Sequence, residues 1–115
     1  KYPMGLLTNG IPKVQRHKAA AANLTDFFNP VIISGEHVTR KPDPILFEAM
    51  LKDLNVDASE AAMIGDRLAT DIAGAAAAGI TTIQVYRPDN NHADGDEATP
   101  DHVITDLTEL AEILE

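Results

Sequence analysis

Several residue types are absent or scarce in this chain of 115 residues, and each absence excludes a class of protein. Cysteine is absent, which excludes disulfide scaffolds and thiolate metal sites and predicts a reducing, cytoplasmic location. Tryptophan is also absent and aromatic residues make up only 4% of the chain, so a core must be built from aliphatic side chains. That composition favours an α/β layered domain over a β-sandwich. No apolar run approaches the length of a membrane span, so we expect no membrane partner.

Basic residues are outnumbered two to one, with 9 Lys and Arg against 18 Asp and Glu and a formal net charge of −9. A surface of this charge repels phosphate backbones, so we expect no nucleic-acid partner. The acidic excess is more simply a solubility feature. No G-x-G-x-x-G follows any expected strand, which makes a dinucleotide-binding domain a weak alternative.

Short apolar segments alternate with longer amphipathic ones along the whole chain, with no internal repeat and no interdomain linker. This alternation predicts one α/β domain over residues 1–115, with a parallel sheet and helices on both of its faces. Strands are expected at residues 4–7, 31–33, 61–65, 81–86 and 103–104. Helices are expected at residues 12–22, 44–54 and 71–79, and from residue 106 to the end of the chain.

Capping residues set the expected helix ends. Pro12 suits a first helical turn, and Asp43 before Pro44 suits a helix start. Thr70 is the expected N-cap of the third helix, and Gly79 is its expected left-handed end. Asn23 is the expected end of the first helix, and Asn55 is the expected end of the second. Asp106 with Glu109 is expected to form a capping box at the start of the last helix. Helical spacing predicts apolar faces formed by Phe47, Met50, Leu51 and Leu54 and by Leu107, Leu110, Ala111 and Leu114.

Two aspartates flank the loop that follows the expected strand at 61–65. Asp66 comes at the carboxyl end of this strand, where open α/β sheets place ligands, and Asp71 follows five residues later. Two converging carboxylates repel each other unless a cation lies between them, and Mg²⁺ is the usual cation where phosphate oxygens share its coordination shell. The alternative is that Asp66 is an ordinary turn residue and Asp71 an ordinary helix-start charge.

Thr8 and Lys41 follow the carboxyl ends of two other expected strands. A hydroxyl, an ammonium and a metal-holding carboxylate together complement a phosphate group. Taken singly, Thr8 before Asn9-Gly10 could be turn chemistry, and Lys41 could be a solvated surface lysine. Their joint placement at one edge of a parallel sheet favours a binding site.

The segments LLTNG, RKPDP and GDRLATD, in this order, resemble the second, third and fourth motifs of the haloacid dehalogenase (HAD) superfamily. The resemblance covers essentially the whole chain. The chain is similar in particular to the phosphatase branch of the superfamily, which includes N-acylneuraminate-9-phosphatase-like and 5′-nucleotidase-like members.

The resemblance assigns a role to each motif residue. It implies that Thr8, aided by the backbone of Asn9, binds the phosphoryl group and that Lys41 balances its charge. Asp66 would ligate Mg²⁺, and Asp71 would orient Lys41 or a metal-bound water. Arg67 is accessory. By the same resemblance, the substrate is a small phosphorylated metabolite.

One part of the superfamily pattern is missing. HAD enzymes use an Asp-x-Asp motif after an earlier strand, and its first Asp forms an aspartyl-phosphate. The only such letters here, Asp94-Gly95-Asp96, lie in an acidic connection outside the superfamily order. We therefore expect residues 1–115 to be a partial HAD-like core domain that lacks its N-terminal central strand and its cap. Its sheet would have two unpaired edges and exposed apolar surface.

Two functional readings follow. In the first, the intact parent is a Mg²⁺-dependent phosphatase, this chain alone is inactive, and an N-terminal segment or a second chain completes the sheet. In the second, the chain is a non-catalytic module that binds a phospholigand or a partner chain. Dehalogenase chemistry within the superfamily stays open. The four histidines show no ligand spacing, so we expect no zinc site.

Overall fold

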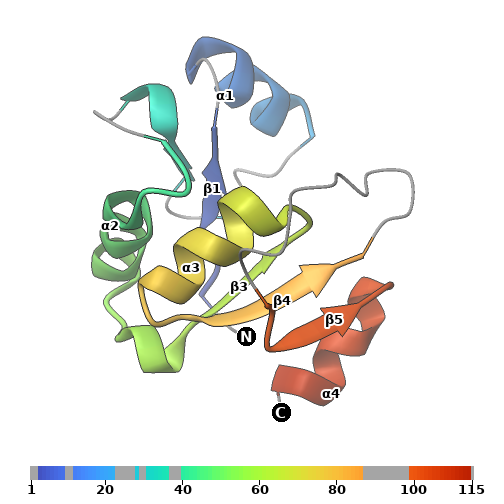
Figure 1. Ribbon diagram of the computed structural model, residues 1–115. Coiled ribbons are helices and arrows are strands. Elements are labelled where there is room, and N and C mark those ends of the chain that lie inside the picture. Colours follow the sequence, from blue (N-terminus) through green and yellow to red (C-terminus); the bar gives the residue numbers. More distant parts are fainter. Residues whose placement is uncertain are drawn as a thin grey trace. The chain divides into compact units, whose positions relative to one another are not determined.

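The computed structural model describes residues 3–9, 12–22, 28, 31–36, 40–86 and 99–114, drawn in Figure 1. The chain divides into two compact units, Lys1–Asp57 and Ala58–Glu115. In the part of the chain that is described, no helix is both long and apolar enough to cross a membrane. The predictions for Asn23, His37, His92 and the Asp94–Asp96 segment lie outside the described residues.

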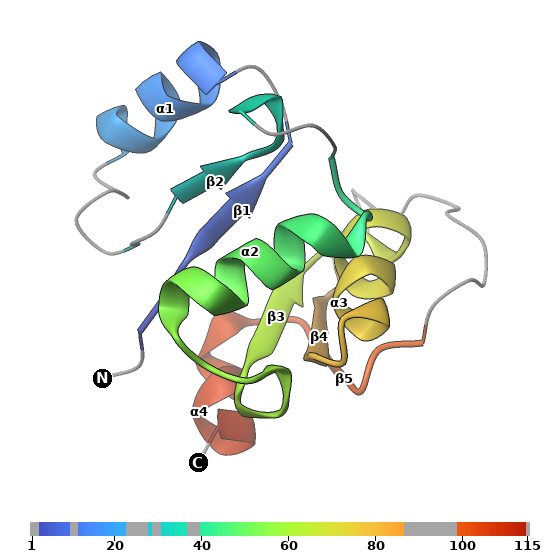
Figure 2. The same cartoon turned by 90° about the vertical axis from the view of Figure 1, so that its left-hand side faces the viewer.

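The first unit contains a two-stranded parallel sheet. Strand β1 (Leu6–Thr8) pairs with β2 (Val31–Ile33), so that Thr8 and Ile33 end the two strands side by side. Figure 2 shows helices α1 (Pro12–Ala21) and α2 (Pro44–Leu54) on opposite sides of this pair. A short 3₁₀ turn, η2 (Ser34–Glu36), follows β2. These elements confirm the predicted order of strand and helix.

Helix α2 begins and ends at the predicted residues. The Asp43 carboxylate accepts a hydrogen bond of 2.9 Å from the Ile45 backbone N–H, and Pro44 occupies the first turn. At the other end Asn55 is left-handed, with φ of 59°, and the Val56 N–H reaches back to the Leu51 carbonyl at 3.1 Å. This pattern satisfies the last carbonyl groups of the helix, as the local sequence predicts.

The buried face of α2 differs from the predicted one by about one position. Leu46 is fully buried and Phe47 is 2% exposed, whereas Met50 and Leu51 are half-buried. Leu46 was not among the expected core residues, because a strict i, i+3, i+4 count starting at Phe47 omits its neighbour. Helix α2 packs against β1, and the Met50 side chain fills the space that a side chain at Gly5 would need.

The second unit contains a three-stranded parallel sheet. Strands β3 (Ala62–Gly65), β4 (Thr81–Val85) and β5 (His102–Ile104) lie in that order. Helices α3 (Ala73–Ala77) and α4 (Leu110–Leu114) cover opposite faces of this sheet in Figures 1 and 2. The connecting 3₁₀ turns are η3 (Ala58–Glu60) and η6 (Leu107–Glu109).

Alternation along β4 and β5 builds the core beneath α4. Ile83, Val85 and Ile104 are buried together on one face of the sheet. The residues that pack against them are Ala62, Leu110, Ile113 and Leu114. The predicted apolar face of the last helix is therefore only partly right, because Leu107 is 55% exposed and Ala111 is also exposed. Leu107 deviates because it lies in the 3₁₀ turn before α4, and the core-facing side of α4 carries Leu110, Ile113 and Leu114 instead of Ala111.

Hydrogen bonds hold β4 and β5 together at both ends. The Asp101 carboxylate accepts from the Thr82 backbone N–H at 2.9 Å and from the Thr82 hydroxyl at 3.2 Å, and the Asp101 N–H donates to the Thr82 carbonyl at 3.0 Å. At the carboxyl end the Tyr86 N–H donates to the Ile104 carbonyl at 2.8 Å. Thr82 is 1% exposed, so Asp101 satisfies a buried polar side chain as well as fixing the register.

The helix after β3 begins earlier than predicted. Its first turn is a π-helix, η4 (Leu68–Ile72), with Arg67 as its N-cap, so the prediction of Thr70 as the N-cap and Asp71 as the helix start is wrong. The Ile72 N–H donates to the Arg67 carbonyl at 3.2 Å, which is the wide spacing of a π-turn. The predicted end is confirmed, since Gly79 has a φ of 81° and the Ile80 N–H bonds the Ala75 carbonyl at 3.0 Å.

The described strands form two sheets rather than one. Strand β1 pairs only with β2 and β3 pairs only with β4, so each leaves one edge without a partner strand among the described residues. No residue of these two strands is fully buried, and Ile64 of β3 is 38% exposed. This agrees with the expectation of unpaired edges and exposed apolar surface.

The capping box before α4 is confirmed and perturbs the pKa of both its carboxyls. Bonds to the Asp106 carboxylate from the Thr108 backbone N–H, and then from its hydroxyl, hold the pKa of Asp106 below its ordinary 3.8. Backbone bonds from Thr105 and Asp106 likewise lower the pKa of Glu109 from 4.5. Stability from these groups is therefore complete above the ordinary values and is lost as pH falls through the lowered ones.

We expect Asp106→Ala to lower the melting temperature by a few degrees at pH 6, because the ionised carboxylate no longer caps the helix. At pH 3 or below the difference from the unsubstituted chain should shrink. Thermal melts followed by circular dichroism at both pH values measure this, with Glu112→Ala on the exposed side of α4 as the control. An equal loss at both pH values would contradict the assignment.

Candidate functional site

Thr8, the last residue of β1, lies in a small polar network with the first helix. The Gln15 amide nitrogen donates to the Thr8 hydroxyl at 3.0 Å and to the Asn9 carbonyl at 2.9 Å. The Thr8 hydroxyl in turn donates to the same carbonyl at 3.2 Å. Since β1 and β2 are parallel, this network stands at the carboxyl end of the pair, the edge at which α/β sheets bind ligands.

Lys41 reaches the same place from a distant part of the chain. Its backbone N–H donates to the Asn9 side-chain carbonyl at 3.0 Å, and its ammonium group lies 3.4 Å from the Leu7 carbonyl. The peptide bond between Lys41 and Pro42 is cis. Half-buried Thr8, Asn9 and Lys41 are therefore assembled as the sequence predicted, while the roles assigned to them stay predictions.

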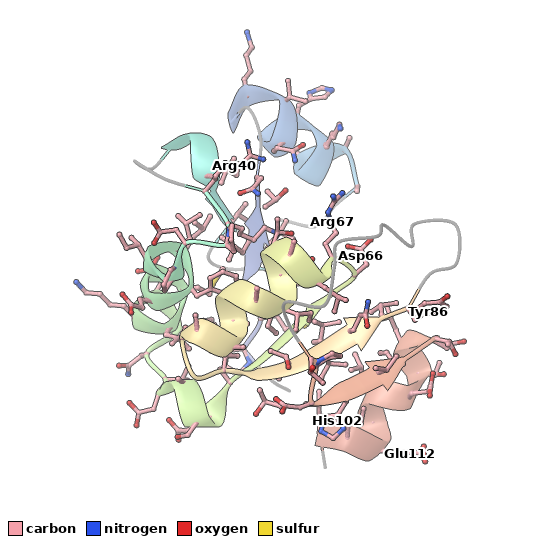
Figure 3. The ribbon with its side chains drawn as sticks, viewed as in Figure 1. Arg40, Asp66, Arg67, Tyr86, His102 and Glu112 are labelled. Carbon is pink, nitrogen blue, oxygen red and sulfur yellow. The ribbon has the colours of Figure 1, made fainter. Side chains whose placement is uncertain are left out.

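The two aspartates lie in the second unit and differ sharply in environment. Asp66 follows the end of β3 and is half-buried, and the Gln84 amide approaches its backbone carbonyl at 3.5 Å. Asp71 is 5% exposed, and its carboxylate accepts from the Arg67 backbone N–H at 3.3 Å. Figure 3 shows Asp66 and Arg67 beyond β3, with Tyr86 beyond the neighbouring β4 and His102 at the opposite end of the sheet.

The Asp71 side chain closes the loop after β3. A Cβ atom built on Gly65 would lie 2.6 Å from Asp71 Cβ and 2.7 Å from its Cγ, so a side chain at residue 65 would overlap with it. Together with the bond to Arg67, this close approach holds residues 65–71 in a narrow turn. Asp71 thus has a structural role within this unit.

The described residues contain no group of three or more His, Cys, Asp or Glu side chains that could hold a metal ion by themselves. His17 and His102, the two described histidines, are both exposed. A metal ion bound at the carboxyl end of β3 would therefore need Asp66 together with other oxygen donors. Mg²⁺ is bound in this way, because it keeps several waters and takes one or two carboxylates plus phosphate oxygens.

Sequence reasoning did not find Gln15 or Gln84. Each is a single neutral residue inside an expected helix or strand, and no spacing marks it. Gln15 lies seven residues after Thr8, so its contact depends on how the chain turns between β1 and α1. That turn carries no local signal of where the amide group will point.

The sequence profile described as HAD-hydrolase-like matches residues 38–110. The chain is 43% identical to a phosphoserine phosphatase of Thermus thermophilus over 96% of this chain and 45% of that protein. It is 40% identical to a glyceraldehyde 3-phosphate phosphatase of Pyrococcus furiosus over 99% of this chain and 48% of that protein. The chain therefore spans slightly less than half of each relative.

Among solved structures, the chain is similar to the HAD-hydrolase YfnB of Bacillus subtilis, crystallised bound to magnesium. The TM-score is 0.87 and the identity 26%, covering 100% of this chain and 50% of that one. The parallel α/β arrangement is shared over the whole described length.

Proposed function

Because the chain belongs to the HAD-hydrolase-like family, we propose that residues 1–115 are a partial core domain of a Mg²⁺-dependent phosphatase. The intact parent hydrolyses a small phosphorylated metabolite, a phosphate monoester, through an aspartyl-phosphate. The chain supplies groups that hold the phosphate and the metal, and the nucleophile lies elsewhere in the parent. The two relatives named above are phosphatases and are about twice as long as this chain, which supports the proposal.

The observation that carries the proposal is the assembly of Thr8, Asn9 and Lys41 at the end of β1. A phosphoryl group presents acceptor oxygens and negative charge, and it is bound by hydroxyl and N–H donors with a cation beside them. In the proposal Thr8 donates to a phosphoryl oxygen, aided by the backbone at Asn9. Lys41 neutralises the charge of the phosphate and of the attacking carboxylate.

Asp66 is the proposed metal ligand in the second unit. A single half-buried carboxylate at a strand end suits Mg²⁺, which completes its shell with water and substrate oxygens, better than it suits Zn²⁺. The bound ion would supply charge stabilisation at the phosphoryl oxygens. Asp71 is proposed to orient Lys41 or a metal-bound water.

We expect the chain alone to bind inorganic phosphate and to hydrolyse no p-nitrophenyl phosphate. Lys41→Met should weaken phosphate binding about tenfold, because a charged partner of the anion is lost. Isothermal titration measures the binding, and release of the coloured phenol measures turnover. Lys52→Met, on the exposed side of α2, is the matched control.

Two outcomes would overturn the proposal. If Lys41→Met and Lys52→Met bound phosphate equally well, Lys41 would have no part in the site. If the chain hydrolysed the ester and Asp66→Asn abolished the activity, the chain would carry its own nucleophile. Phosphate binding by the whole parent without turnover would instead favour a non-catalytic module.

A further inference from the structure

The Gln15 side chain takes part in the network around Thr8 although no motif includes it. We propose that Gln15 is a positioning residue that makes the Thr8 hydroxyl a hydrogen-bond donor to the phosphoryl group. The inference rests on the proposed function, because it concerns the same phosphate site. It concerns how Thr8 acts there, and it adds a residue from helix α1 to the site.

The first step is the orientation of the Gln15 amide. The Asn9 backbone carbonyl can only accept a hydrogen bond, so the atom of Gln15 that lies 2.9 Å from it must be the NH₂ nitrogen. The same nitrogen lies 3.0 Å from the Thr8 hydroxyl oxygen. Its two hydrogens therefore serve these two acceptors.

The second step concerns which hydrogen bonds the Thr8 hydroxyl can make. The hydroxyl has one hydrogen and two lone pairs, and Gln15 occupies one lone pair by donating to it. The hydroxyl hydrogen points to the Asn9 carbonyl at 3.2 Å. A ligand oxygen can take over that hydrogen only if the hydroxyl turns away from the carbonyl.

The third step concerns what the carbonyl loses when the hydroxyl turns. Gln15 already donates to the Asn9 carbonyl, so the carbonyl keeps a partner when Thr8 releases it. Without Gln15 the carbonyl would be left unpaired in a half-buried place, which opposes the rotation. A hydroxyl that accepts one bond is also a stronger donor of the next. Both effects favour donation from Thr8 to an acceptor oxygen of the ligand.

The test is a double-mutant cycle on the binding of inorganic phosphate by the whole chain, measured by isothermal titration. Gln15→Met keeps the length of the side chain and removes the donor, and it should weaken binding about fivefold, the effect of one hydrogen bond. Thr8→Val keeps the shape and removes the hydroxyl. In the Thr8→Val background, Gln15→Met should change the affinity little, because Gln15 acts through the hydroxyl.

Two further variants guard against a purely structural effect. Gln15→Leu also removes the donor without adding a charge, so it should weaken binding by a similar factor even if Gln15→Met folds poorly. His17→Met, at an exposed position of the same helix, should leave the affinity unchanged. A structural role for Gln15 would lower the affinity equally with and without the Thr8 hydroxyl.

The outcomes separate the inference from the proposed function. Normal phosphate binding by Gln15→Met, or an equal loss in the Thr8→Val background, would overturn the role of Gln15 and leave the phosphate site standing. Absence of phosphate binding by the unsubstituted chain would overturn the site and the role of Gln15 with it.

Discussion

Gly65→Ala is expected to destabilise the chain by about 3 kcal/mol, as overpacking of a tight site does. The added methyl group would lie 2.6 Å from Asp71 Cβ and 2.7 Å from its Cγ. These atoms are close to the backbone of a buried residue, so they cannot rotate away as the tip of a flexible side chain could. The loop between β3 and the π-turn would have to move. Urea denaturation measures the loss as a lower transition midpoint.

Two comparisons separate this overlap from other effects of losing a glycine. Gly79→Ala places a side chain at a φ of 81°, but its Cβ would meet Ala58 at an ordinary 3.6 Å. Its expected cost is only the left-handed strain, about 1 kcal/mol. In the Asp71→Gly background the overlapping atoms are gone, so Gly65→Ala should cost much less there. If the effects of Gly65→Ala and Asp71→Gly on the free energy of unfolding were additive, steric overlap would not be the cause of the destabilisation.

Phe47→Ala is expected to destabilise the chain by about 4 kcal/mol, because it empties the space of a large buried side chain. Phe47 is 2% exposed, and Leu46 beside it is fully buried. A loss of this size is a large part of the stability of an ordinary domain. Phe47→Leu, which leaves a smaller cavity, should cost clearly less and serves if the alanine variant does not fold.

Ile45→Ala is the matched control for Phe47. Ile45 is also an apolar residue of α2, two positions before Phe47, but 51% of its surface is exposed. Its loss should change the free energy of unfolding by less than about 0.5 kcal/mol. Similar losses for the two variants would mean that the face of α2 toward the core is not the one described.

Local signals in the sequence predicted the ends of helix α2 and the capping box of α4. Asp43 and Asn55 act through hydrogen bonds to residues within one turn of the helix, so their position in the sequence nearly determines their contacts. The parallel pairing of the described strands was also predicted, because short apolar strands that are joined by helices form parallel sheets.

The π-turn after β3 could not be predicted, because it depends on contacts that a residue list does not reveal. Thr70 has the chemistry of an N-cap, but the helix starts two residues before it. The deciding contacts are the Asp71 carboxylate with the Arg67 N–H and the close approach of Asp71 to Gly65. Asp71 does lie in the first turn of this helix, as predicted, but it is not the residue at which the helix begins.

The candidate site was predicted at the level of which residues gather, and less well at the level of what holds them. Thr8 and Lys41 were expected together from their positions after strand ends, and Asn9 is the residue through which they meet. Gln15 was missed, because amide contacts across a turn leave no pattern in the sequence. That Asp66 and Asp71 act with these residues stays a prediction.

The double attachment of β4 to β5 has a consequence for how this edge of the sheet responds to substitution. Asp101 and Thr82 fix one end of the pairing, and Tyr86 and Ile104 fix the other. A substitution that breaks one of these attachments therefore leaves the other in place. Strand β5 should then fray from the broken end while its opposite end stays paired with β4.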